Sequence, residues 1–329
     1  MKFVEGIALQ PGSLTASAES VRRTLGGMAP LRPGALVALV GIGASEHVAR
    51  SAANAWRALG IRAVAVSAAD LQGSKLPLAD VYVAMSESGR SAETVAALRG
   101  APGRRVGITN DPGAPLADVV DEVLPLDSGP DSPIYTTGYT ATLQAVGMLG
   151  EHWAGTSSDW AALPEQVARV TDEGGKIVAG LAETFDRARI VDVVASGASL
   201  ATAGEGALMM RESARLHTAS HETFNYLHGP MEPVDAEAAC VVIGGGRELR
   251  LARELADLGC PTLLITANAE VEDADHLPVL RLPTPPSPLA GTVLEIVPLQ
   301  LLAAEVGSRR GLRADGFRYE QDDIKLDAR

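Results

Sequence analysis

The chain has 329 residues, 46% of them hydrophobic, which is enough for two domains of about 150 residues each and excludes a disordered chain. Its net charge is −13 and no cluster of Lys or Arg stands out, which argues against binding to nucleic acid or to an anionic membrane. Cys240 and Cys260 lie in apolar, strand-like runs and are expected to be buried, reduced thiols. The N-terminus lacks a signal-peptide pattern, and Glu295 and Pro298 interrupt the apolar run at residues 293–306, so we expect a cytoplasmic protein.

The first part of the chain predicts a short lead followed by an α/β domain. Within residues 1–30 we expect an irregular lead at 1–12 and a helix capped by Ser13. Residues 31–154 alternate apolar runs with helical patterns, which is typical of a doubly wound parallel sheet in a three-layer, flavodoxin-like α/β domain. The expected strands are 35–42, 62–66, 81–85, 105–109 and 122–126, and the expected last helix is 135–153.

The second half repeats this organisation. Gly43-Ala44-Ser45 follows an apolar strand and begins a helix, and the same three residues recur in the same context as Gly197-Ala198-Ser199. Two homologous α/β domains, residues 31–154 and 160–311, are the simplest explanation. The remaining expectations are a linker at 155–159, a connecting helix at 160–185, strands at 238–244 and 261–266, helices at 247–258 and 288–307, and a polar tail at 312–329.

Residues 81–94, VYVAMSESGRSAET, predict a strand, a loop and a helix. Ser86, Ser88 and Ser91 can surround one point with hydroxyl groups, and the turn at Gly89 can aim backbone N–H groups and the positive end of the helix at that point. This is the chemistry of a phosphate cradle. The alternative is that Ser91 only caps the helix and the other serines are solvated turn residues.

The phosphate is expected to belong to a small metabolite. No Lys follows the loop in the Walker fashion, and the glycines do not fit G-x-G-x-x-G, which argues against a nucleotide fold and a nicotinamide-dependent dehydrogenase. We therefore expect no cofactor. Ser45 flanks the other strand-to-helix turn and can add a further hydroxyl to the cradle.

Three motifs resemble those of the sugar isomerase (SIS) domain family. The spacing S-x-S-G-x-[ST]-x-E-T at residues 86–94 resembles the SIS signature, in which the hydroxyls hold the phosphate of a ketose or aldose phosphate. Residues 204–212, GEGALMMRE, look like the E-G-A-L-K-L-K-E helix in the isomerase domain of glutamine:fructose-6-phosphate aminotransferase, and His228-Gly229-Pro230 looks like the H-G-P turn that follows it. The resemblance implies two tandem SIS domains from about residue 30 to the final helix. Glu87 is expected to face a sugar hydroxyl or solvent.

Glu205 and Glu212 are two helical turns apart, so both carboxylates project from one helix face. Burial beside Leu208 and Met209 would raise the pKa of such a carboxylate toward neutrality, as the base of an aldose–ketose isomerisation requires. The resemblance identifies Glu212 as this base, and Glu205 is expected to orient the sugar or the helix. The alternative is an amphipathic helix whose glutamates meet solvent.

His228 is the candidate for opening a cyclic sugar, because an imidazole titrates near neutrality. In the family this histidine reaches into a neighbouring subunit's site, which implies a homodimer or higher homo-oligomer. His217, His221 and Glu222 do not form H-E-x-x-H, so no metal site is expected.

The sequence also departs from the aminotransferase pattern. It shows neither a glutaminase domain nor an N-terminal Cys, so the chain is not expected to draw ammonia from glutamine. Met209 stands where the aminotransferase has Lys, and Lys325 is the candidate Schiff-base lysine.

The expected function is a sugar-phosphate aldose–ketose isomerase, in the form of an isomerising amino-sugar-phosphate deaminase or a deglycase. The expected ligand is a phosphorylated sugar or amino sugar. The alternative is a non-catalytic sugar-phosphate-binding regulator, since SIS domains also serve as regulatory modules and the lysine at position 209 is missing. The sequence shows no DNA-binding domain, which counts against a repressor.

Overall fold

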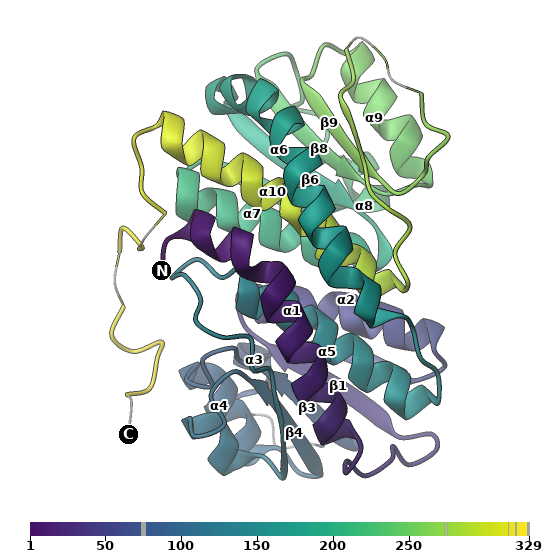
Figure 1. Cartoon of the computed structure of the whole chain (residues 1–329), viewed down its shortest axis with the longest axis vertical. Coiled ribbons are helices and arrows are strands. Elements are labelled where there is room, and N and C mark those ends of the chain that lie inside the picture. The colour runs from purple at the N-terminus through teal and green to yellow at the C-terminus, as the bar shows by residue number, and fades with distance from the viewer. Residues whose placement is uncertain (74–76, 273, 275, 315, 320, 328–329) are drawn as a thin grey trace. The chain divides into compact units, whose positions relative to one another are not determined.

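The structure, a computed structural model, describes residues 1–329 except 74–76, 273, 275, 315, 320 and 328–329. It divides into two compact units, named here by their sheets (Figure 1). The β1–β5 unit comprises Leu9–Asp131, Thr137–Pro164 and Arg318–Arg329, and the β6–β10 unit comprises Met1–Ala8, Ser132–Thr136 and Glu165–Phe317.

The sheet of the β1–β5 unit is parallel throughout, in the order β2-β1-β3-β4-β5. All of β3 (Val81–Met85) is buried, because its continuous apolar run suits a strand covered on both faces. The chain leaves β1 toward β2 on one side and leaves β3 toward β4 on the other, so the carboxyl ends of β1 and β3 mark the switch point at which open α/β sheets bind ligands. The other elements are β1 (Leu36–Gly41), α2 (Ala44–Ala58), β2 (Arg62–Ser67), α3 (Ala68–Leu71), α4 (Ala92–Gly100), β4 (Arg104–Thr109), η1 (Pro115–Val119), β5 (Glu122–Pro125), α5 (Thr137–Ala154) and η2 (Trp160–Ala162).

The β6–β10 unit repeats this topology, with the parallel order β10-β9-β8-β6-β7. Here β6 takes the place of β1 and β8 the place of β3, which confirms the prediction of two doubly wound α/β units. Cys240 and Cys260 are buried free thiols, as predicted. The elements are α6 (Leu163–Arg187), β6 (Ile190–Ala195), η3 (Gly197–Ser199), α7 (Leu200–Ala214), β7 (Thr218–Glu222), α8 (Thr223–Leu227), β8 (Ala238–Ile243), α9 (Arg247–Asp257), β9 (Thr262–Thr266), β10 (Val279–Arg281) and α10 (Pro288–Arg309).

Among the described residues, α10 is the one helix long and apolar enough to cross a membrane. It lies along α7 (Figure 1), and 78% of its most apolar window is buried inside the protein. Such burial is what a core helix of a globular unit shows, so its apolar composition is explained by packing.

The N-terminal residues correct one prediction. Residues 1–12 are not an irregular lead, because α1 (Phe3–Leu25) begins at Phe3 and continues through Pro11. Phe3, Ile7 and Leu14 recur at helical spacing and are all buried. The stabilisation from burying them is larger than the cost of the backbone hydrogen bond that Pro11 cannot donate. Ser13 lies inside this helix and is not a cap.

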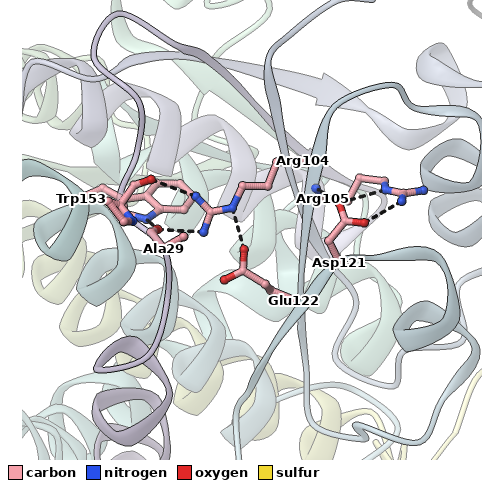
Figure 2. A network of polar contacts seen from close by, with 7 residues as sticks. Ala29, Arg104, Arg105, Asp121, Glu122 and Trp153 are labelled. Atoms are coloured by element: carbon pink, nitrogen blue, oxygen red, sulfur yellow. Dashed lines mark hydrogen bonds and ion pairs between the residues drawn. The ribbon is translucent and has the colours of Figure 1, made fainter.

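Arg104 and Arg105 form a network of polar contacts at the amino-terminal edge of the sheet in the β1–β5 unit (Figure 2). Arg104 Nε donates to Glu122 Oε1 over 2.6 Å, its NH2 group donates to the Ala29 carbonyl over 2.8 Å, and its guanidinium lies 5.3 Å from the ring centre of Trp153. Arg105 pairs with Asp121 at 2.7 Å. These contacts join β4, β5, α5 and the segment after α1 at the edge opposite the switch point.

Candidate functional site

The serine loop, residues 86–91, connects β3 to α4 at the switch point of the β1–β5 unit. Ser86 is buried, and its Oγ donates to Ser91 Oγ over 3.1 Å. Ser91 N donates back to Ser86 Oγ over 3.4 Å, and Arg90 N donates to Ser88 Oγ over 3.3 Å. The loop therefore gathers its three hydroxyl groups at the start of α4, where backbone donors and the helix dipole favour an anion.

Gly89 allows the loop to take this path. Its φ of 64° lies in the left-handed region, and a Cβ there would stand 2.5 Å from Ala114 Cβ and 2.8 Å from Thr109 Oγ1. Only glycine fits without displacing these neighbours.

Ser91 is the N-cap residue of α4 by position, but in the described structure its side chain makes no capping hydrogen bond. Its oxygen faces Ser86 instead. The arrangement thus favours the phosphate-cradle interpretation over the alternative of a simple helix cap.

Ser45 lies in the first turn of α2, directly after β1. Because β1 and β3 are parallel neighbours, the Ser45 turn and the serine loop lie at the same edge of the sheet. Gly41 makes the turn possible, since a Cβ at this position would come within 2.5 Å of the Ser45 backbone carbon.

Residues 324–327, in the polar C-terminal tail, lie against the serine loop. Ala92 N donates to the Ile324 carbonyl over 3.2 Å, and Leu326 N donates to the Arg90 carbonyl over 2.9 Å. Leu326 also packs against the buried apolar cluster of this unit, which gives the segment a hydrophobic anchor. The segment therefore docks along the end of the serine loop.

Lys325 is brought to the serine loop by this docking, and its Nζ donates to Ser88 Oγ over 3.1 Å. Burial lowers the pKa of Lys325, while the charges of Glu87 and Glu93 act in the opposite direction. In a chain of net charge −13, this ammonium group supplies a positive charge next to the hydroxyls that are expected to hold a phosphate. Glu87 is half-buried, and its Cγ lies against Gly138 of α5.

Glu205 and Glu212 lie on α7 of the β6–β10 unit. Glu205 is buried, and Met209, which stands between them at the position of the aminotransferase lysine, is fully buried. Burial raises the pKa of Glu212 to about 7, although the neighbouring Arg211 opposes the shift. This is the environment that the apolar neighbours predicted, and it poises a carboxylate to exchange protons near neutral pH.

Glu295 is a second acid whose pKa is raised by burial, and no sequence motif pointed to it as a site residue. From α10 its carboxylate accepts hydrogen bonds from Ser199 Oγ at 2.8 Å and Thr202 Oγ1 at 2.9 Å, and burial raises its pKa to about 7. The available signal was an acid within the most apolar stretch of the helix, since the other acid of α10, Glu305, is exposed near its end.

His228 is exposed at the C-terminal end of α8. His221 Nε2 stands 3.5 Å from Asp192 Oδ1. Over the part of the chain that the structure describes, no group of three His, Cys, Asp or Glu side chains is arranged to hold a metal ion.

Known proteins resemble the chain in sequence and in fold. A family model described as SIS domain matches residues 185–306. The isomerizing glutamine:fructose-6-phosphate aminotransferase of Gloeobacter violaceus is 30% identical over 262 residues, which cover 71% of this chain and 42% of that protein. The chain thus spans less than half the length of this curated relative.

Two solved structures share the fold over nearly the whole chain. Glucosamine-6-phosphate deaminase from Thermotoga maritima has a TM-score of 0.83 at 21% identity and is matched over 98% of this chain and 99% of its own. Tagatose-6-phosphate ketose/aldose isomerase from Escherichia coli has a TM-score of 0.79 at 20% identity, over 94% of this chain and 93% of its own. The family match, the homology and the two sheets of like strand order together show that the chain belongs to the sugar isomerase (SIS) domain family, with two SIS-like domains.

Proposed function

We propose that this protein is a cytoplasmic enzyme that isomerises a phosphorylated sugar or amino sugar between its aldose and ketose forms. The observation that carries the proposal is the serine loop, in which three hydroxyls, a helix N-terminus and the Lys325 ammonium group surround one place. The names of the similar proteins, an isomerizing aminotransferase, a glucosamine-6-phosphate deaminase and a ketose/aldose isomerase, support the same class of substrate.

The proposed chemistry divides into phosphate binding and proton transfer. Ser45, Ser86, Ser88 and Ser91 bind the phosphate, and Gly89 sets the path of the loop. Glu212 removes the proton from C2 of the opened sugar and returns it to C1, or the reverse, so that no net proton is gained or lost. Glu205 orients the helix or the sugar, and His228 assists ring opening.

An amino-sugar substrate would follow the same route with one further step. Moving the proton from C2 of a 2-amino aldose turns its C–N bond into an imine, which water hydrolyses to the ketose and ammonia. Lys325 is the candidate amine for a Schiff base with the open-chain carbonyl, which forms with loss of water. In this role the uncharged amine reacts, a form that the lowered pKa favours, and the phosphate is then held by the serines and the helix N-terminus alone.

The second candidate function is a sugar-phosphate sensor without turnover. It is favoured by Met209, which leaves the acid–base helix without the lysine of the aminotransferase. A sensor would bind the same ligands, but no carbon-bound proton of the ligand would exchange with solvent.

Thermal unfolding with and without ligand tests the phosphate cradle. We expect sugar 6-phosphates to raise the melting temperature, because a ligand that binds only the folded state stabilises it, and the unphosphorylated sugars to have little effect. Ser88→Ala should reduce the difference, and Ser158→Ala, outside the loop, should leave it unchanged. Equal stabilisation by both kinds of sugar, or by neither, would contradict a phosphate cradle.

Hybrid oligomers test the proposed homodimer and the role of His228. If His228 completes the site of a partner chain, mixing inactive His228→Ala with inactive Glu212→Gln should restore about a quarter to a half of wild-type activity, since some hybrid sites carry neither substitution. Verified heterodimers that recover no activity would place both groups in the site of one chain.

A further inference from the structure

The β6–β10 unit has its own turn at the place that the serine loop occupies in the β1–β5 unit. This glycine loop, residues 244–246, connects β8 to α9 at the switch point between β6 and β8. Backbone hydrogen bonds confirm the correspondence, since Ser86 N donates to the Ile108 carbonyl and Gly244 N donates to the Ile265 carbonyl, both over 3.1 Å. The two units therefore present equivalent strand-to-helix turns.

The donors at the glycine loop already hold an anion, the carboxylate of Glu248. Gly246 N donates to Glu248 Oε2 over 3.1 Å, and Thr223 Oγ1 donates to Glu248 Oε1 over 2.6 Å. The hydroxyl of Ser196, at the end of β6, is a further hydrogen-bonding partner. Donors from three separate parts of the unit thus converge on one carboxylate, as they would on a bound phosphate.

The carboxylate is enclosed and remains ionised. Only 3% of Glu248 is exposed, and burial by itself would raise its pKa, yet the hydrogen bonds from Thr223, Ser196 and Gly246 leave the pKa lower than its ordinary value. The surroundings therefore supply enough donors to stabilise a buried negative charge.

The loop is shaped around this side chain. Gly244 has a φ of 145°, and a Cβ there would lie 2.8 Å from Glu248 Cγ and 2.9 Å from Glu248 Oε2. Glu93 takes the same position in α4, second after the N-cap, but it is half-buried and acts on the charge of Lys325. The acid at this helical position therefore fills the loop in the β6–β10 unit, whereas in the β1–β5 unit it acts on Lys325 through its charge.

We propose that the β6–β10 unit retains an anion cradle that Glu248 closes from within, so that each chain binds a single phosphorylated ligand, at the serine loop. Replacing Glu248 by a side chain short enough to vacate the space of its carboxylate opens a second anion site at the glycine loop. The single stoichiometry rests on the proposed function, whereas the opening of the glycine loop stands independently of it.

Phosphate binding to three variants tests the inference, with inorganic phosphate as the probe and calorimetry and ³¹P NMR as the measurements. Ser88→Asp places a carboxylate in the serine loop and serves as the background. We expect the wild type to bind one phosphate per chain, Ser88→Asp none, and Ser88→Asp/Glu248→Ser one, with affinity at least tenfold above the background. Glu248→Gln in the same background keeps the space filled and should bind none.

The outcomes separate this inference from the proposed function. If the wild type binds nothing but the Glu248→Ser double variant gains a site, the serine-loop proposal fails and the closed cradle stands. If Glu248→Ser folds poorly, phosphate should restore its cooperative melting but not that of Glu248→Gln. Two phosphates per wild-type chain, or neither binding nor rescue in the Glu248→Ser variants, would overturn the inference.

Discussion

Glu212→Gln is expected to lower turnover of a sugar phosphate by roughly 100-fold or more while leaving ligand binding nearly unchanged. The amide keeps the size of the side chain but cannot accept the proton from carbon. Because the pKa of Glu212 is raised to about 7, the wild-type rate should increase as the pH rises through 7, where the carboxyl group loses its proton and becomes a base. The residual rate of the variant should lack this increase.

Solvent exchange and a matched control complete this experiment. Product made by the wild type in deuterium oxide should carry deuterium at C1 or C2, and product made by Glu212→Gln in a matched time should not. Glu305→Gln changes an exposed acid on α10 and should leave the rate unchanged. Normal turnover by Glu212→Gln, or a wild type that never exchanges a substrate proton, would leave the sensor as the better interpretation.

Gly41→Ala is expected to lower the free energy of unfolding by about 2–3 kcal/mol and to weaken phosphate binding. The added Cβ would stand 2.5 Å from the Ser45 carbonyl carbon and 2.6 Å from its oxygen. Backbone atoms cannot rotate away as a flexible side chain can, so either β1 or the Ser45 turn must move. Urea unfolding measures the first effect, and phosphate-dependent melting measures the second.

Gly12→Ala is the matched control, because it makes the same chemical change inside α1. A Cβ there meets open space, with nothing within 4 Å. Alanine also favours a helix interior over glycine, so this variant should gain about 0.5–1 kcal/mol. A Gly41→Ala protein that unfolds at the wild-type urea concentration would show that the turn can relax around the methyl group.

The fold could be predicted from sequence where the spacing of apolar residues fits one kind of secondary structure clearly. β3 matches its predicted bounds, Val81–Met85, because a fully buried strand requires an unbroken apolar run. β7 was missed because its sequence, TASHE, is polar and it lies at the edge of the sheet. The start of α1 was wrong because Pro11, Gly12 and Ser13 together are typical of a helix boundary, whereas burial of residues on both sides keeps the helix continuous.

The candidate site could be predicted only where its residues are close in sequence. The serine loop has its three hydroxyl groups within six consecutive residues, and the raised pKa of Glu212 agrees with the expectation from the apolar residues beside it in sequence. The contact between Lys325 and Ser88 joins residues 237 positions apart, and Glu295 meets Thr202 across 93 positions. Such contacts depend on how whole elements pack, which no local pattern contains.

The shared strand order of the two units has an evolutionary consequence. Like topology and the recurrence of Gly-Ala-Ser after β1 and β6 are most simply explained by duplication of one ancestral unit. After duplication, one copy could keep its hydroxyl-lined turn under selection while the turn of the other lost its serines and took in the helical acid that both copies carry. Substitutions that change affinity for the phosphate and substitutions that change the proton chemistry would then arise in different copies, so a lineage could alter one property while the other was preserved.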